Sequence, residues 1–165
     1  MNDLILFEKV IDFLHQIGIE TSEVSLKNDA CFLPGFMKNN GKILIDKKEV
    51  KYPGDLLHEA AHIAVVPLAE RPYLEGENIG NRKDSDAEEM MSIARSFAAC
   101  IHLDINPHFV FHEYGYKGGG ASIVENFERG NYFGVPILQW LGMTASAKDS
   151  PGPKVYPEMT KWLRD

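Results

Sequence analysis

One pentapeptide constrains this chain more than any other stretch: His58-Glu59-Ala60-Ala61-His62, inside the apolar segment 56–66. On a helix, residues four positions apart lie one turn apart on the same face, so both imidazoles can reach one point. Two histidines and a glutamate are costly to bury in such a segment without partners. The segment therefore predicts a buried helix that directs both histidines at one metal ion. An ordinary amphipathic helix is the alternative, because the string also arises by chance.

Zinc chemistry accounts for these residue types at this spacing. Neutral imidazoles bind zinc at about 2.0–2.1 Å, and a hydrolytic zinc keeps one coordination position for water. Zinc acidifies the water, and Glu59 lies where it can take the proton. The pattern thus predicts His58 and His62 as zinc ligands, Glu59 as the general base, and one further protein ligand, as in a metallopeptidase.

Composition limits the partners. The chain has 165 residues, 44% of them hydrophobic and 25% charged, which is typical of one globular domain. Its net charge of −7 argues against a broad surface for nucleic acid. We therefore expect a peptide or protein substrate and no nucleic-acid partner, and the oligomeric state is left open.

Sequence features also bear on location. The first residues lack a basic region, and Glu8 and Asp12 interrupt the first apolar stretch, which argues against a signal peptide. No apolar run approaches the length of a membrane span. Cys31 and Cys100 lie far apart in apolar surroundings, which favours two buried thiols over a disulfide. These features predict a cytoplasmic protein without a membrane partner.

The chain before the pentapeptide predicts a helix and a hairpin. Apolar residues at helical spacing indicate an amphipathic helix over 3–17. Two apolar stretches, 30–37 and 42–46, flank Asn40-Gly41 and predict an antiparallel hairpin. In zinc peptidases a strand such as 42–46 often borders the cleft and pairs with extended substrate. A plain sheet edge is the alternative.

The pentapeptide helix is expected to begin at Asp55 as N-cap and to end near Val66, because Pro67 follows. Residues 67–83 are polar and rich in breakers, which predicts a loop. A second helix is expected over 84–101.

The third zinc ligand is expected on that second helix. Helical projection places Glu88 on the margin of the apolar face and Glu89 further toward solvent, so Glu88 is favoured over Glu89. Asp84 or Asp86 would then accept a hydrogen bond from a ligand histidine. An acidic first turn that only complements the helix dipole is the alternative.

These residues carry a resemblance to a family. The order of strand 42–46, helix with His58-Glu59-x-x-His62, and acidic helix Glu-Glu-Met-Met-Ser-Ile-Ala-Arg-Ser-Phe-Ala-Ala resembles the gluzincin metallopeptidases, most nearly the ImmA/IrrE type. The resemblance covers roughly residues 40–101. It implies a small sheet joined to helices, with zinc bound by both histidines and a downstream glutamate. It also implies a zincin-like metallopeptidase domain, assigned to residues 1–150, with 151–165 as an extension of the same domain.

The C-terminal third is less patterned. Asn106-Pro107 predicts an N-cap and a short helix through His112 and Tyr114. Further short helices are expected over 122–129 and 136–141, with a last helical turn over 158–164.

An oxyanion that develops beside the zinc needs a hydrogen-bond donor. Tyr114, Tyr116, Tyr132 or a histidine can supply it, and no spacing rule decides among them.

Together the sequence predicts an α+β domain with a small antiparallel sheet against several helices. It would bind Zn²⁺ through His58, His62 and Glu88, with water in the fourth position. The alternative is a non-catalytic regulatory or protein-interaction module of the same fold. In that case another histidine or Cys100 would fill the fourth position.

Overall fold

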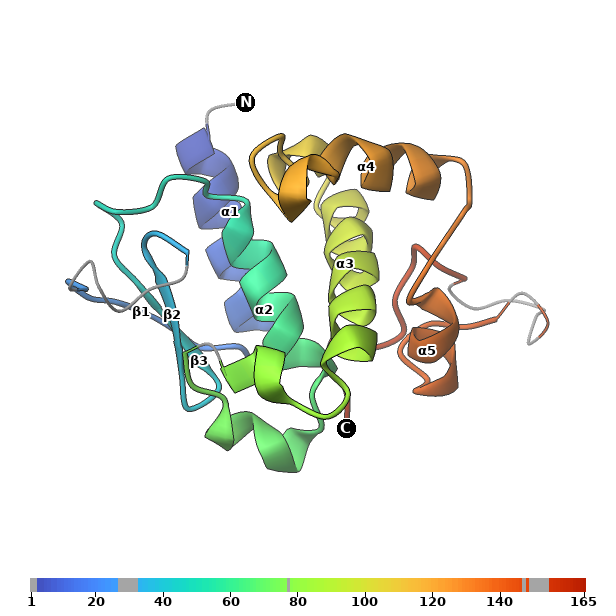
Figure 1. Ribbon diagram of the computed structural model, residues 1–165, viewed down its shortest axis with the longest axis horizontal. Coiled ribbons are helices and arrows are strands. Elements are labelled where there is room, and N and C mark those ends of the chain that lie inside the picture. The colour runs from blue at the N-terminus through green and yellow to red at the C-terminus, as the bar shows by residue number, and fades with distance from the viewer. Residues whose placement is uncertain (1–2, 27–32, 77, 147, 149–154) are drawn as a thin grey trace.

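The helix that carries the pentapeptide, α2 (Asp55–Val65), lies in the middle of the fold, between a small sheet and helix α3 (Ser85–His102) (Figure 1). The structure is a computed structural model, which describes residues 3–26, 33–76, 78–146, 148 and 155–165. Ten of the eleven α2 residues are buried; His58 is the exception. The α+β class predicted from the sequence is confirmed.

The sheet has three strands in the order β1-β3-β2. β2 (Phe36–Asn39) and β3 (Lys42–Ile45) form the antiparallel hairpin predicted around Asn40-Gly41. The start of the expected first strand, residues 30–32, lies outside the described residues. β1 (Thr21–Glu23) pairs with β3 in parallel, so the sheet is mixed rather than wholly antiparallel. The sequence did not predict β1, because its three residues show no alternation of apolar and polar side chains.

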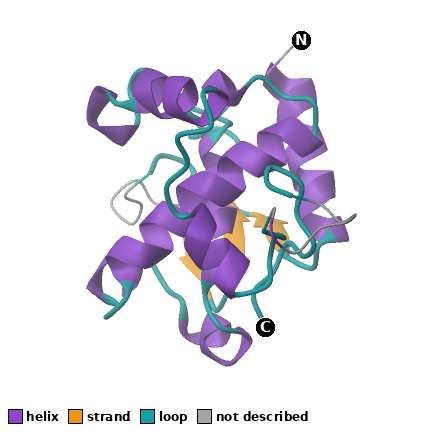
Figure 2. Cartoon of the chain, turned by 90° about the vertical axis from the view of Figure 1, so that its right-hand side faces the viewer, coloured by secondary structure: helices purple, strands orange, loops and turns teal. Residues whose placement is uncertain are grey.

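Helices cover the sheet. In the turned view, the strands form a small patch behind the helical layer (Figure 2). α1 (Asp3–Gln16) matches the predicted helix and buries Leu6, Phe7, Val10, Phe13 and Leu14. These residues join the core that also encloses α2 and α3. Burial of each such side chain contributes about 1.5–3 kcal/mol, so the core holds α2 firmly in place.

The start of α2 depends on a glycine rather than on a side-chain cap. The N-cap is Gly54, and the expected capping role of Asp55 is wrong, since Asp55 is the first helical residue. A Cβ at Gly54 would lie 1.8 Å from the carbonyl oxygen of Phe109. The missing side chain therefore allows the 109–110 backbone to pack directly on the start of α2.

The end of α2 is completed from the far end of the sequence. Arg164 donates its backbone N–H to the Ala64 carbonyl at 2.9 Å and Nη1 to the Val65 carbonyl at 3.3 Å. Arg71 donates Nε to the Val66 carbonyl at 3.1 Å and Nη2 to the Arg164 carbonyl. The last carbonyls of a helix lack intrahelical partners, and these two arginines supply them.

The segment between α2 and α3 is more ordered than a loop. It holds two 3-10 helices, η2 (Leu68–Tyr73) and η3 (Asn78–Asn81). The N-cap at Asn106 is confirmed, because its side chain accepts from the His108 N–H, but the helix η4 (Pro107–Phe109) is only three residues long.

The remaining helices are η5 (Tyr116–Gly118), α4 (Gly120–Glu128) and α5 (Val135–Trp140). The last two agree with the predicted helices, whereas residues 158–164 form bends and irregular chain rather than a helical turn. Among the described residues, no helix combines the length and hydropathy that a membrane crossing requires.

Candidate metal centre

The two histidines of the pentapeptide converge as predicted. Their Nε2 atoms lie 3.1 Å apart, and the rings meet edge to face with centroids 4.6 Å apart. Burial, helped by the nearby Lys38 ammonium, lowers the pKa of His58 to about 3. Burial, with His58 and Lys38 as smaller causes, also lowers the pKa of His62 well below its usual value. Both imidazoles are therefore neutral at pH 7, the form that binds a metal.

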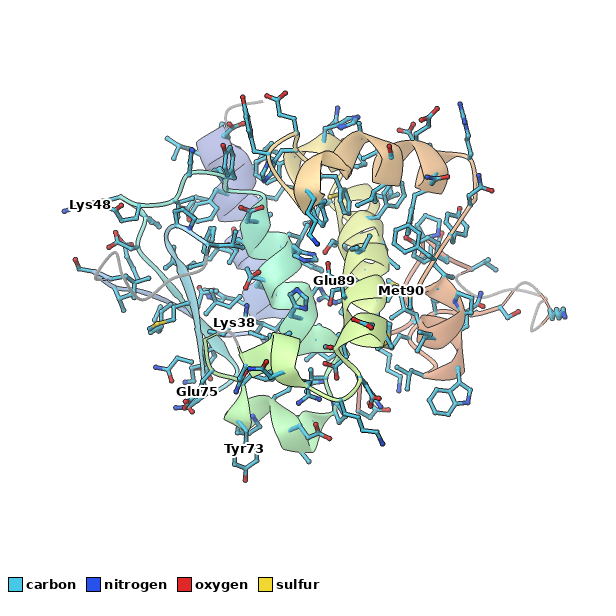
Figure 3. All side chains as sticks on the ribbon, viewed as in Figure 1. Lys38, Lys48, Tyr73, Glu75, Glu89 and Met90 are labelled. Atoms are coloured by element: carbon cyan, nitrogen blue, oxygen red, sulfur yellow. The ribbon has the colours of Figure 1, made fainter. Side chains whose placement is uncertain are left out.

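Glu89 on α3 supplies a third donor. Its Oε1 lies 3.6 Å from His58 Nε2, and its Oε2 lies 3.2 Å from His62 Nε2. One donor atom from each of the three residues lies within 4.8 Å of the others. Figure 3 shows Glu89 between α2 and α3.

The separation of the two histidine nitrogens fits two ligands of one tetrahedral zinc ion. Ligand atoms at 2.0–2.1 Å from a tetrahedral ion lie about 3.3 Å from one another. The two Nε2 atoms, 3.1 Å apart, lie close to that value. One Glu89 oxygen lies 3.2 Å from His62 Nε2 and the other lies 3.6 Å from His58 Nε2, and a single Glu89 oxygen lies within 4.8 Å of both nitrogens. Two neutral imidazoles and one carboxylate also form the donor set of known catalytic zinc sites.

Glu88, the glutamate favoured from the sequence, does not join the group, and Glu89 lies beside the histidines instead. Its two carboxylate oxygens accept from Arg82 Nε and Nη2 at 2.7 and 2.8 Å. Arg82 also donates to Glu70 on η2 at 2.7 Å. Glu88 is 2% exposed, and it serves to fix the start of α3 against the 67–83 segment.

The physical reason lies in what each glutamate contacts. The helical projection ordered the two by exposure correctly, since Glu88 is 2% exposed and the Glu89 side chain is 44% exposed, but exposure does not decide which carboxylate meets the histidines. Arg82 lies on the preceding segment, which was expected to be a loop, and captures Glu88.

Ser92 fixes the orientation of His62. Its Oγ donates to the Glu88 carbonyl at 2.7 Å and lies 3.3 Å from His62 Nδ1. Because the Ser92 hydroxyl proton is used in the bond to Glu88, Ser92 Oγ can only accept a hydrogen bond from the Nδ1–H of His62. The Nε2 atom of His62 then carries the lone pair, which faces His58 and Glu89. Asp84 and Asp86, the expected partners, are both exposed to solvent.

Glu59 is paired with a residue of the sheet and is not a member of the metal group found among the described residues. Its Oε2 forms an ion pair with Lys38 Nζ on β2, and both side chains are 11% exposed. Figure 3 places Lys38 on the sheet side of α2. Sequence reasoning gave no reason to single out Lys38, because the ion pair joins residues 21 positions apart.

A cavity of about 930 Å³ opens over these residues. Its lining combines apolar side chains with charged residues, tyrosines and histidines. Its lining includes Leu33, Phe36, Met37, Lys38, Tyr52, Asp55, His58, Glu59, His62, Ile79, Glu89, His112, Tyr114, Tyr116 and Lys117. The volume suits a short peptide segment rather than a single small ion.

Neither alternative for strand 42–46, substrate pairing or a plain sheet edge, holds, because β3 is the central strand and is paired on both sides. β2 is the strand beside the cavity. The outer edge of β2 is itself partly occupied, since Gly76 donates to the Lys38 carbonyl at 2.9 Å and Asn39 bridges to Glu75.

Tyr116 and His112 also line the cavity. The Tyr116 ring packs edge-on against His58 with centroids 5.2 Å apart, and its hydroxyl is buried without a hydrogen-bond partner among the described residues. Burial raises the pKa of Tyr116, and nearby Asp55 and Glu89 add to that rise. His112 lies beside it and bonds through Nε2 to Asp55 Oδ1 at 2.9 Å.

The other expected donors are less suited. Tyr114 lines the cavity mouth but is 71% exposed, and its ring stacks on Tyr52. Tyr132 packs on Phe127 and Tyr156 and does not line the cavity.

Among the described residues, the cysteine does not extend the metal group. Cys100 is fully buried as a free thiol and is not part of the group found among the described residues. Cys31 lies outside the described residues.

Comparisons of this chain with protein-family models, with curated proteins and with solved structures find no match.

Proposed function

We propose that the protein is a zinc-dependent metallopeptidase. The observation that carries the proposal is the convergence of His58, His62 and Glu89 on one point, with Glu59 alongside and a large cavity above. Three protein donors leave a tetrahedral ion one position for water or substrate. The group found among the described residues holds three donors, which supports an open site over a closed structural one.

Bound zinc would supply Lewis acidity, which polarises a carbonyl and acidifies water. Glu59 takes the proton of the attacking water and passes it to the leaving amine when the peptide bond breaks. Ser92 holds His62 in the tautomer that presents Nε2.

Tyr116 is the donor best placed for the developing oxyanion. The Tyr116 hydroxyl remains protonated at neutral pH because its pKa is raised, and it has no competing partner among the described residues. Removal of one such donor typically lowers kcat about 100–1000-fold. Tyr116→Phe tests this role without removing the ring that packs on His58.

The test of the proposal has two steps. Protein purified without chelator should contain about one zinc per chain by emission spectroscopy, and His58→Ala should lose it. His15→Ala is the matched control, because His15 is exposed and bonds to Thr21 instead.

Peptide hydrolysis is then measured on a broad peptide library. Glu59→Gln should keep its zinc and lose hydrolysis, while Glu128→Gln, a change at an exposed glutamate, should lose neither. A wild-type protein without zinc refutes the metal centre. A zinc-loaded wild type that cleaves nothing refutes the peptidase and favours a regulatory metal-binding module.

A further inference from the structure

Glu59 has a competing role that the proposed reaction must suppress. It directly follows His58, and zinc also binds glutamate oxygens, at about 2.0–2.2 Å. A Glu59 carboxylate free to turn toward the ion would occupy the position needed for water. The same change would remove the general base. Some group must therefore hold this carboxylate away from the metal.

Lys38 is placed to do so. Its Nζ contacts Glu59 Oε2 from β2, whereas Glu89 approaches the histidines from α3 on the other side of α2 (Figure 3). The metal group found among the described residues includes Glu89 and excludes Glu59. Both members of the ion pair are 11% exposed, and such shielding from water strengthens their attraction.

The charge of Lys38 also reaches the histidines and Glu89. It contributes to the lowered pKa of His58 and of His62, and it opposes the raised pKa of Glu89. An ammonium near the ion costs metal affinity. With a neutral residue at position 38, the group of His58, His62 and Glu89 would bind metal more tightly.

We propose that Lys38 is a positioning residue that keeps Glu59 out of the metal's ligand set and so preserves it as the base. The inference rests on the proposed function, since it concerns the same metal centre. It makes a prediction about metal affinity that does not require activity. Loss of an ordinary structural ion pair would weaken the site or leave it unchanged, whereas loss of Lys38 should tighten it.

The experiment is a double-mutant cycle of zinc affinity, measured by competition with a chromophoric chelator. The four proteins are wild type, Lys38→Met, Glu59→Gln and the double variant. Lys38→Met should bind zinc at least about tenfold more tightly from the charge alone, since a unit charge on the order of 6 Å from a divalent ion has that effect even in water. A further gain of at least about tenfold should appear only while Glu59 is present, because only then can the carboxylate become a ligand.

Two control variants isolate the role of position. Lys38→Arg keeps the charge and should retain wild-type affinity. Lys42→Met removes a lysine from the same hairpin, but its ion pair with Glu20 is exposed, so zinc affinity should not change.

Distinct results overturn the inference and the proposed function. Equal gains from Lys38→Met in both backgrounds, or no gain, would show that Lys38 does not position Glu59. Absence of zinc binding by the wild type would overturn the metal centre itself.

A second measurement covers the case in which Lys38→Met does not fold. The cobalt(II) absorption spectra of wild type and Glu59→Gln should coincide, since Glu59 is not a ligand while Lys38 holds it. A change in band position or intensity between them overturns the inference.

Discussion

The same substitution at two neighbouring glutamates on α3 should change two different properties, the stability of the protein in one case and its metal affinity in the other. Glu88→Gln and Glu89→Gln each remove one negative charge and keep the side-chain shape. Glu88 lies in a two-oxygen bond to Arg82, and Glu89 lies beside both histidine Nε2 atoms. The first change should therefore affect stability and the second metal affinity.

The stability loss for Glu88→Gln follows from its surroundings. Removing one member of a buried ion pair typically costs about 3–5 kcal/mol, because the other charge is left unpaired. In this variant Arg82 would still pair with Glu70 at 2.7 Å, and its side chain is 21% exposed, so its charge would keep a partner and some contact with water. We expect about 2–3 kcal/mol, which for a chain of this size lowers Tm by about 4–12 °C.

Glu89→Gln should leave the metal-free protein about as stable as wild type. Burial raises the pKa of Glu89, so its charge gives no stability at neutral pH. Its zinc affinity should fall by at least about a hundredfold, because a ligand change should exceed the 10–100-fold effect of outer-sphere partners.

Thermal unfolding with chelator and zinc competition without it measure the two effects. A Glu88→Gln variant with wild-type stability and much weaker zinc binding would refute the geometry argued above, since it would return the ligand role to Glu88. Equal zinc affinity of Glu89→Gln and wild type would do so as well.

Three further outcomes are expected. Gly54→Ala should lower the free energy of unfolding by about 3 kcal/mol or more, because its Cβ would meet a backbone oxygen, whereas Gly80→Ala, with open space around it, should change little in urea titrations. Burial raises the pKa of Cys100 to about 12, so this thiol should resist iodoacetamide at pH 8 in the native protein and react in urea, as read by mass spectrometry. The His58 pKa is about 3 in the folded state and near 6.5 unfolded, so the unfolded state binds more protons between these values and stability is lost as pH falls. From pH 7 to 5 the metal-free protein should lose about 2 kcal/mol through His58, and a His58→Gln/His62→Gln variant should lack that slope in chelator-containing urea titrations.

Local patterns predicted the parts of this protein that local physics determines. Apolar spacing located α1, α2 and α3, and Asn40-Gly41 located the hairpin, because each depends on residues close in sequence. The convergence of His58 and His62 followed in the same way, since four residues make one helical turn.

Long-range contacts were beyond that reasoning. The choice between Glu88 and Glu89 depends on Arg82, and the position of Glu59 depends on Lys38 from a strand. Tyr116 reaches His58 across 58 positions of sequence, so no periodicity could separate it from other tyrosines. A pairing of charged side chains between elements leaves no repeat in the sequence to detect.

The arginine contacts at the end of α2 have a consequence for how this protein folds. Arg164 and Val65 are 99 positions apart, so the carbonyls that close the histidine-bearing helix find their partners only after most of the chain is in place. Contacts of such high sequence separation carry a large loop-closure entropy and slow the search for the native topology. The early folding nucleus would then hold α2 against α3 while its last turn still frays, and the C-terminal segment would complete that turn among the final events of folding.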